Sequence, residues 1–214
     1  MFTWTSRPAL WRAGVALLAA FSLSGCLELQ AQDTGAGGTD TAQTGQRSFA
    51  LASSVIVPSG VTAKGPPGFC IDKRSVKTGR TGGFALIAPC AALDARADGL
   101  GLETAILTLQ VQPVGALGGD ISAQALAEVF AAEEPIYLED GDGISLVQLA
   151  AGGEAIIPQS DPTHWRGALK VNGYLVGLAV YAEVGGAAAG DVGKTLLIDF
   201  AEAVLSASTE APSQ

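Results

Sequence analysis

The single histidine of the chain, His164, stands close to two residues that could complete a hydrolytic set. A histidine acts as a general base when a nucleophile and an orienting carboxylate lie within hydrogen-bond reach of its ring. Ser160 and Asp161 supply these residue types, so a hydrolase that uses His164 with either of them is one hypothesis. Nearby residues on an extended segment do not make a triad by proximity alone, and the chain has no Gly-x-Ser-x-Gly nucleophile elbow. The simpler interpretation is a turn at Asp161-Pro162 that leads into a strand, with Trp165 packed on a sheet.

A carboxylate-rich loop is the second candidate for chemistry. Glu139, Asp140 and Asp142 lie within four residues, and such oxygen ligands suit calcium. An EF-hand loop also needs a bidentate glutamate at its twelfth position, and that arrangement is not present. Zinc needs several cysteine or histidine ligands at set spacings, and Gly193-Lys194-Thr195 lacks the leading glycine of a phosphate-binding loop. We therefore interpret the acidic segment as a solvated turn and expect neither a metal nor a cofactor.

The N-terminal residues have the organisation of an export signal. Two arginines precede an apolar stretch at 13–23, which is shorter than the roughly 20 residues of a membrane-spanning helix. The next residues complete the motif Leu23-Ser24-Gly25-Cys26, which resembles the lipobox of bacterial lipoproteins. The resemblance implies that the signal peptide, residues 1–25, is removed and that Cys26 is acylated with chains such as palmitate. The expected membrane partner is then the lipid bilayer, held through acylated Cys26.

The cysteine count agrees with this interpretation. Three cysteines occur, and once Cys26 carries lipid the remaining pair, Cys70 and Cys90, is free to form a disulfide. Such a bridge suits an oxidising compartment and contributes about 3 kcal/mol in the chain-entropy model. Leu27 follows Cys26 in place of the aspartate that retains many Gram-negative lipoproteins at the inner membrane. The resemblance therefore implies a lipid-anchored protein at the periplasmic face of the outer membrane.

The charge of the chain limits its partners. The net charge is −9, and it becomes −11 after removal of residues 1–25, which hold two basic and no acidic residues. Binding to DNA or RNA depends on clustered lysines and arginines, so we expect no nucleic-acid partner. One cationic cluster lies between the paired cysteines and is either a contact surface or a solvated loop; it comprises Lys73, Arg74, Lys77 and Arg80.

Composition also predicts the domain organisation. Residues 26–47 contain the lipidated cysteine and a segment rich in Gly, Ala, Thr and Gln, which is typical of a flexible tether. Residues 48–208 form one domain of about 160 residues, a size that supports a substantial core. Residues 209–214 are expected to be a disordered tail.

Hydrophobic patterning predicts the elements of that domain. Strands are expected at 49–57, 69–71, 84–88, 106–111, 144–149, 154–157 and 169–181. Asn172-Gly173 predicts a type I′ hairpin turn within 169–181. Gly152-Gly153 predicts a second hairpin, between the strands at 144–149 and 154–157. A mid-chain helix is expected to begin at Asp120 and to end before Pro135. A C-terminal helix is expected to begin at Asp191 and to bury a stripe of apolar residues.

This order of elements predicts an α+β fold, an antiparallel sheet packed by a mid-chain helix and a C-terminal helix. The order resembles the α/β/α sandwich of the Mog1, PsbP and DcrB-like group, whose members are mostly assembly or binding factors. The two cysteine-containing strands, at 68–72 and 83–90, also resemble small uncharacterised bacterial lipoproteins. We therefore expect no enzyme but an accessory module of the cell envelope with an envelope protein as partner. The alternatives are the hydrolase and a small-ligand-binding module that uses a cleft between sheet and helices.

Overall fold

The computed structural model describes residues 51–57, 60–79, 82–94, 104–114, 121–141 and 143–210. These residues belong to one compact unit, Gln46–Gln214. The signal peptide, Cys26 and the tether lie outside the described residues. Asp120, Arg80 and Asp142 also lie outside them.

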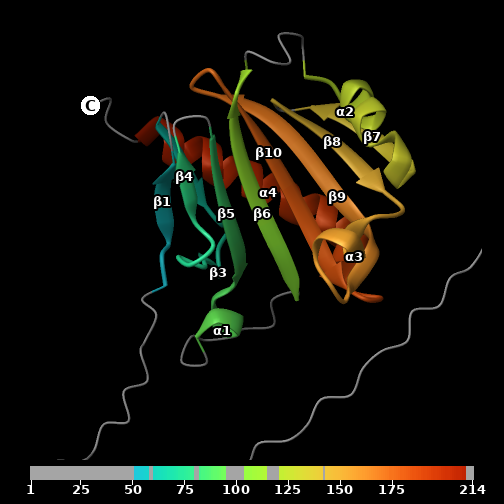
Figure 1. Ribbon diagram of the computed structural model, residues 1–214, viewed down its shortest axis with the longest axis horizontal. Helices are drawn as coiled ribbons and strands as arrows, with labels where there is room; N and C mark the ends of the chain where they lie inside the picture. The colour runs from blue at the N-terminus through green and yellow to red at the C-terminus, as the bar shows by residue number, and fades with distance from the viewer. Residues whose placement is uncertain are drawn as a thin grey trace, which may run out of the picture. The chain divides into compact units, whose positions relative to one another are not determined.

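An antiparallel sheet forms the centre of the domain (Figure 1). Its strands lie in the order β3, β5, β6, β10, β9, β8, β7, and β4 also pairs with β5. The strand bounds are β3 Phe69–Ile71, β4 Lys77–Gly79, β5 Gly82–Pro89, β6 Ala105–Pro113, β7 Pro135–Gly141, β8 Ile144–Leu149, β9 Ser160–Val171 and β10 Tyr174–Glu183. A separate two-stranded sheet consists of β1 Ser54–Val57 and β2 Val61–Lys64.

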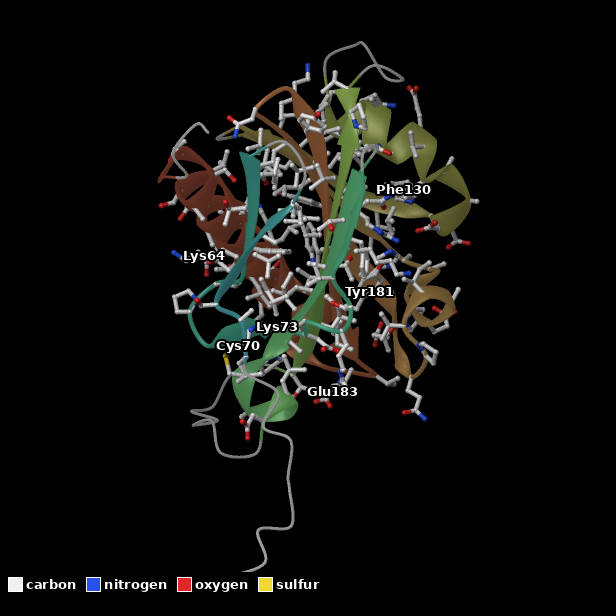
Figure 2. All side chains as sticks on the ribbon, turned by 60° about the vertical axis from the view of Figure 1, so that its left-hand side comes forward. Lys64, Cys70, Lys73, Phe130, Tyr181 and Glu183 are labelled. Carbon is white, nitrogen blue, oxygen red and sulfur yellow. A yellow bond between two sulfur atoms is a disulfide. The ribbon has the colours of Figure 1, made fainter. Side chains whose placement is uncertain are left out.

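Helices cover the two faces of the sheet unequally. The long helix α4, Asp191–Glu210, lies on one face, while α2, Ala123–Val129, and α3, Gly153–Ile156, lie on the other (Figure 2). The remaining helical segments are short and comprise α1 Cys90–Leu93, η3 Ala131–Glu133 and η4 Ala187–Ala189. The α+β class with an antiparallel sheet is confirmed. Among the described residues, no helix is both long and apolar enough to span a bilayer.

The main core lies between the sheet and α4. The predicted stripe of α4 is confirmed, since Leu197, Phe200 and Val204 are completely buried there. Trp165 packs on the same side and donates its indole N–H to the carbonyl of Gly190 at 2.9 Å, just before α4 begins. This contact fixes the start of α4 against β9.

Two local predictions from sequence are also confirmed. Asn172 and Gly173 have positive φ values of 49° and 79° and connect β9 to β10, as a type I′ turn requires. Cys70 and Cys90 form a disulfide with a Cα–Cα distance of 4.9 Å. The antiparallel pairing of β3 with β5 brings the two cysteines together.

The predicted second hairpin is wrong. Residues 153–156 form the short helix α3, and β8 pairs with β7 and β9 instead. Gly152 has a φ of 94°, and a Cβ on Gly153 would lie 2.2 Å from the carbonyl oxygen of Asp161. The two glycines therefore allow a turn and a close approach of α3 to β9. The apolar segment 154–157 is too short for its pattern to distinguish a helix from a strand.

The mid-chain helix is shorter than predicted. It begins after Ser122, whose hydroxyl accepts from the backbone N–H of Ala125 at 3.1 Å. The helix ends at Val129. The edge strand β7 follows it, although Pro135 was expected only to end the helix and the acidic segment was expected to be a solvated turn. Pro135 starts this strand, a position where its missing N–H does no harm.

The two ends of the domain differ from prediction in smaller ways. The strand expected at 49–57 is described only as β1, Ser54–Val57, and its partner β2 was not predicted. At the other end α4 continues through Glu210, so residues 209 and 210 belong to the helix and not to a tail. The backbone N–H of Thr62 in β2 donates to the hydroxyl of Ser208 at 2.9 Å, which ties the last turn of α4 to the small sheet.

Candidate functional site

The sheet face opposite α4 is only partly covered. On β6 the residues Leu107 and Leu109 point into the core beneath α4, so Thr108 and Gln110 point to the other face because side chains alternate along a strand. The helix α2 packs mainly over β7 and β8. The face formed by β5, β6 and β10 is therefore left without a covering helix among the described elements.

A groove of about 470 Å³ lies on this face. Its volume falls within the roughly 300–1,000 Å³ of small-molecule sites. Apolar side chains from α2, α3 and β10 form most of its wall, and they include Leu126, Val129, Phe130, Ile156 and Leu175. Polar side chains from β6, β9 and β10 also line it, and they include Thr108, Gln110, Gln112, Arg166 and Tyr181. We call this cavity the open-face groove.

Arg166 is the charged residue of the open-face groove. Its guanidinium carbon lies 5.0 Å from the ring centre of Phe130 and 5.4 Å from that of Tyr181, within cation–π distance of both. Its Nε–H donates to Nε2 of His164 at 3.2 Å. Among the described residues, no carboxylate forms an ion pair with it. Its two terminal nitrogens have no hydrogen-bond partner in the same part of the chain.

His164 holds Arg166 from behind. The ring is completely buried and stacks on Tyr181 with a centroid distance of 5.2 Å. Burial is the main cause that lowers the pKa of His164, so the ring is neutral at pH 7. Nδ1 lies 3.1 Å from the carbonyl of Pro162, which only accepts, so Nδ1 carries the proton. Nε2 is then an acceptor, which matches the N–H of Arg166.

Two buried polar atoms near this cluster have no hydrogen-bond partner within the described part of the chain. One is the hydroxyl of Tyr181, whose residue is only 1% exposed; burial is the main cause that raises its pKa, and the neighbouring side chain of Thr108 acts against this increase. The other is Oε2 of Glu133, which lies 3.4 Å from Nε2 of His164. Because the imidazole is neutral and accepts there, this contact is not a salt bridge. Unpaired buried polar atoms are rare and are often found where a ligand or water binds.

Comparison with known proteins gives no further assignment. No protein-family model, curated protein or solved structure matches this chain.

The hydrolytic set predicted around His164 is not assembled. Asp161 accepts from the backbone N–H groups of Thr163 and Gly185, each at 2.9 Å, and the Gly185 bond is the main cause that lowers its pKa. The hydroxyl of Ser160 lies 3.3 Å from the carbonyl of Asp161. Neither side chain reaches the imidazole, and no serine, threonine or cysteine of the described residues hydrogen-bonds to it. Asp161 is a structural residue at an irregularity of β9.

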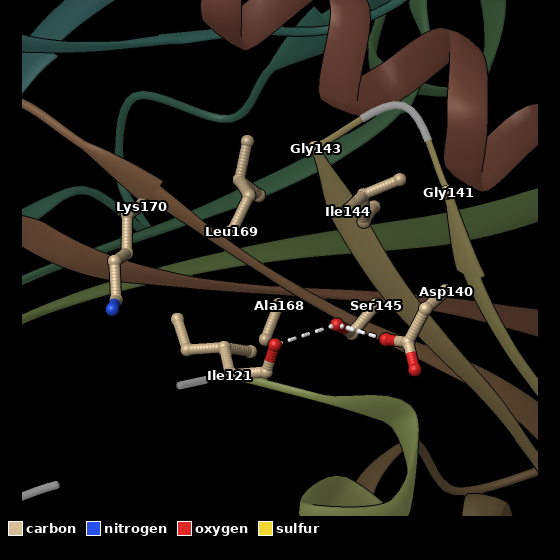
Figure 3. Close-up of a pocket in the computed structure, with 9 residues that line it drawn as sticks. All are labelled: Ile121, Asp140, Gly141, Gly143, Ile144, Ser145, Ala168, Leu169 and Lys170. Atoms are coloured by element: carbon tan, nitrogen blue, oxygen red, sulfur yellow. Dashed lines mark hydrogen bonds between the residues drawn. The ribbon is translucent and has the colours of Figure 1, made fainter. Parts of the chain in front are cut away.

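The carboxylates of the acidic segment do not come together at one site, because Glu139 and Asp140 bind different partners. Glu139 binds Lys194 and Tyr137 on the α4 side, and this contact raises the pKa of Lys194 to about 12. Asp140 accepts from the backbone N–H of Ala123 at 2.8 Å and from Ser145 at 2.6 Å, at a second hollow shown in Figure 3. It therefore holds the start of α2. Within the described ranges, no group of three or more His, Cys, Asp or Glu side chains is placed to hold a metal.

The cationic loop lies at the opposite edge of the sheet from β7. Arg74 is paired with Asp72 through its Nε at 3.1 Å, and this contact lowers the pKa of Asp72. Lys73 and Lys77 are exposed. The loop is anchored by the Cys70 end of the disulfide, and its role as a contact surface stays a prediction.

Arg166 and Tyr181 of the open-face groove, and Glu133 beside His164, were not predicted as site residues from the sequence. Arg166 and Tyr181 lie on strands that pair directly, and their neighbours in register, Ala179 and His164, alternate with core residues. Val129, an apolar residue that also lines the groove, is 65% exposed in the structure, and the sequence alone does not reveal that exposure. Glu133 follows a helix end and gave no signal.

Proposed function

We propose that the chain is a lipid-anchored, non-catalytic accessory module of the cell envelope that binds a small amphipathic molecule in the open-face groove. The groove carries the proposal, because it combines apolar walls, a volume typical of ligand sites and a few polar groups. This interpretation favours the ligand-binding alternative among those that the sequence left open. The hydrolase has no supporting contact among the described residues of β9.

The location belongs to the same proposal. The motif Leu23-Ser24-Gly25-Cys26 supports acylation of Cys26 and a position at the periplasmic face of the outer membrane. The Cys70–Cys90 disulfide agrees with an oxidising compartment. An antiparallel sheet with helices on both faces agrees with the resemblance to the Mog1, PsbP and DcrB-like sandwich, whose members mostly bind or assemble. The cationic loop with Lys73 and Lys77 is the surface that we assign to an envelope protein partner.

Ligand binding can be tested with a groove-filling substitution. Gly177 of β10 lines the groove, and a Cβ there would meet its nearest neighbour at an ordinary 3.9 Å, so a leucine fits by occupying the cavity. The full chain carrying Cys26→Ala is titrated, without detergent, with the neutral fluorophore N-phenyl-1-naphthylamine. We expect saturable binding that Gly177→Leu weakens at least tenfold.

Gly141→Leu is the matched control, because Gly141 lies on β7 outside the open-face groove and a Cβ there meets nothing within 4 Å. It is expected to bind the fluorophore as the parent chain does. Failure of the parent chain to bind, or equal binding by Gly177→Leu, would overturn the proposed function.

A further inference from the structure

The open-face groove contains a positive charge that forms no direct ion pair with a described carboxylate, since Glu133 contacts His164 and not Arg166. Arg166 lies among apolar side chains, uses one N–H for His164 and forms no ion pair with a described carboxylate. The chain as a whole carries a net charge of −9, so an unpaired cation in an apolar cavity is unusual here. A charge that has lost part of its hydration is stabilised when an opposite charge binds next to it.

A second observation comes from the neighbouring strand. Tyr181 lines the same groove, and its hydroxyl is buried at the base of the groove beside Thr108, with no hydrogen bond of normal geometry among the described residues. It is a donor and Arg166 offers further donors, so the polar end of the groove presents hydrogen-bond donors to one acceptor group. A carboxylate with two oxygens fits such an arrangement, because a guanidinium binds it through two parallel N–H bonds.

The geometry points to an amphipathic monocarboxylate as the ligand: we propose that its carboxylate binds Arg166 and Tyr181 while its aliphatic chain lies against Leu126, Val129 and Leu175. This inference rests on the proposed function and adds the chemical class of the ligand. The carboxylate of Glu133 lies 3.4 Å from Nε2 of the imidazole that holds Arg166, so a monoanion bound at Arg166 meets less repulsion from Glu133 than a dianion such as a phosphate monoester.

Arg166 is oriented before any ligand arrives. The imidazole of His164 accepts from Nε, and the rings of Phe130 and Tyr181 lie against the guanidinium. These contacts restrict the side chain, so less rotamer entropy is lost on binding. The terminal nitrogens are the part of the side chain that remains for a ligand.

The test compares ligands that differ only in charge. Decanoate and 1-decanol, both below micellar concentrations, displace N-phenyl-1-naphthylamine from the full chain carrying Cys26→Ala. We expect decanoate to bind at least tenfold more tightly than decanol, as a desolvated charge-assisted hydrogen bond provides. Acetate at the same concentration should displace nothing, because it lacks the chain. Equal affinity for decanoate and decanol, or displacement by acetate, would overturn the assignment of the ligand class.

Substitution of Arg166 separates charge from packing. Arg166→Met keeps the length of the side chain and is expected to reduce the ratio of decanoate to decanol affinity to near one, while fluorophore and decanol binding persist. Arg166→Lys keeps the charge and should retain a preference for decanoate. A ratio unchanged in Arg166→Met would sink the inference and leave ligand binding itself intact. Loss of fluorophore binding by the parent chain would instead sink the proposed function. The comparison of the two ligands on the parent chain decides the inference if the methionine variant does not fold.

Discussion

His164 illustrates how a residue type associated with catalysis serves as a positioning group. Its ring is fully buried, donates to the carbonyl of Pro162 and accepts from Arg166. A proton added to Nε2 would remove the acceptor that Arg166 uses, and the burial of the ring makes this protonation unfavourable. The single histidine therefore lies behind the groove, beneath Arg166, and its charge state matters for stability.

This arrangement predicts a pH-dependent stability. Burial lowers the pKa of His164 in the folded protein below the ordinary 6.5, so the unfolded chain binds more protons between the two values. The unfolding free energy should fall as the pH is lowered from 7 to 5, with a slope of up to about 1.4 kcal/mol per pH unit. The charged groups that act on the ring are Arg166, which favours the neutral form, and Glu133 and Glu154, which oppose it.

Urea denaturation at pH 7, 6 and 5 checks this prediction, with His164→Gln as the control. Glutamine can accept from Arg166 but does not titrate, so its stability should change less over this range. The carboxylates of Asp72 and Asp161 have pKa values lowered by their partners, and their contribution is lost only at pH values below about 4. Identical slopes for the parent chain and His164→Gln would show that His164 does not titrate in this window.

Among the helices and strands, those that follow from local sequence patterns were predictable, and those that depend on contacts with distant segments were not. The Asn172-Gly173 turn and the stripe of α4 follow from backbone preference and helical periodicity alone. The segment 154–157 is too short for periodicity to separate helix from strand, and its outcome depends on the contact of Gly153 with β9. The acidic strand β7 looks like a loop because its edge position leaves most of its side chains exposed.

The candidate site was even less accessible from the sequence. The segment around His164 was predicted to enter a strand, and β9 contains it, but the side chains of Ser160 and Asp161 do not contact the imidazole. An irregularity in β9, where the pairing with β10 shifts between Tyr181 and Glu183, directs Asp161 to backbone groups. Such pairing depends on long-range contacts, and a single sequence does not specify it.

Asp161 is expected to stabilise this irregular segment. Its carboxylate accepts two backbone N–H bonds, one from Thr163 and one from Gly185, which follows the end of β10. Asp161→Ala should lower the unfolding free energy by about 1.5 kcal/mol, the lower end for hydrogen bonds to a charged group because the side chain is partly exposed. Urea denaturation at pH 7 measures the change. Asp199→Ala, at an exposed position of α4, is the matched control and should change stability by less than about 0.5 kcal/mol. Equal effects of the two substitutions would contradict the structural role.

In the domain as a whole, the two faces of the sheet differ in how completely helices cover them. The face beneath α4 is a closed core with completely buried side chains such as Phe200 and Val204. The other face contains the groove with Arg166, and no described helix covers it over β5, β6 and β10. A domain that must stay folded while one sheet face is open needs its stability from the closed side. The Cys70–Cys90 disulfide adds to that stability at the outer strand β3.

The proposed lipid anchor is consistent with the proposed ligand, because a membrane supplies amphiphilic molecules. The anchor predicts the mass of the mature protein: chain 26–214 purified from membranes should carry diacylglycerol and an N-acyl chain on Cys26. Reduction should add two hydrogens, from Cys70 and Cys90. Intact-mass spectrometry measures both values. The variant Cys26→Ala should leave the membrane fraction, since residue 26 then carries no acyl chain to anchor it. An unlipidated mature chain with two free thiols would overturn the envelope location, and the groove would then require a ligand from another compartment.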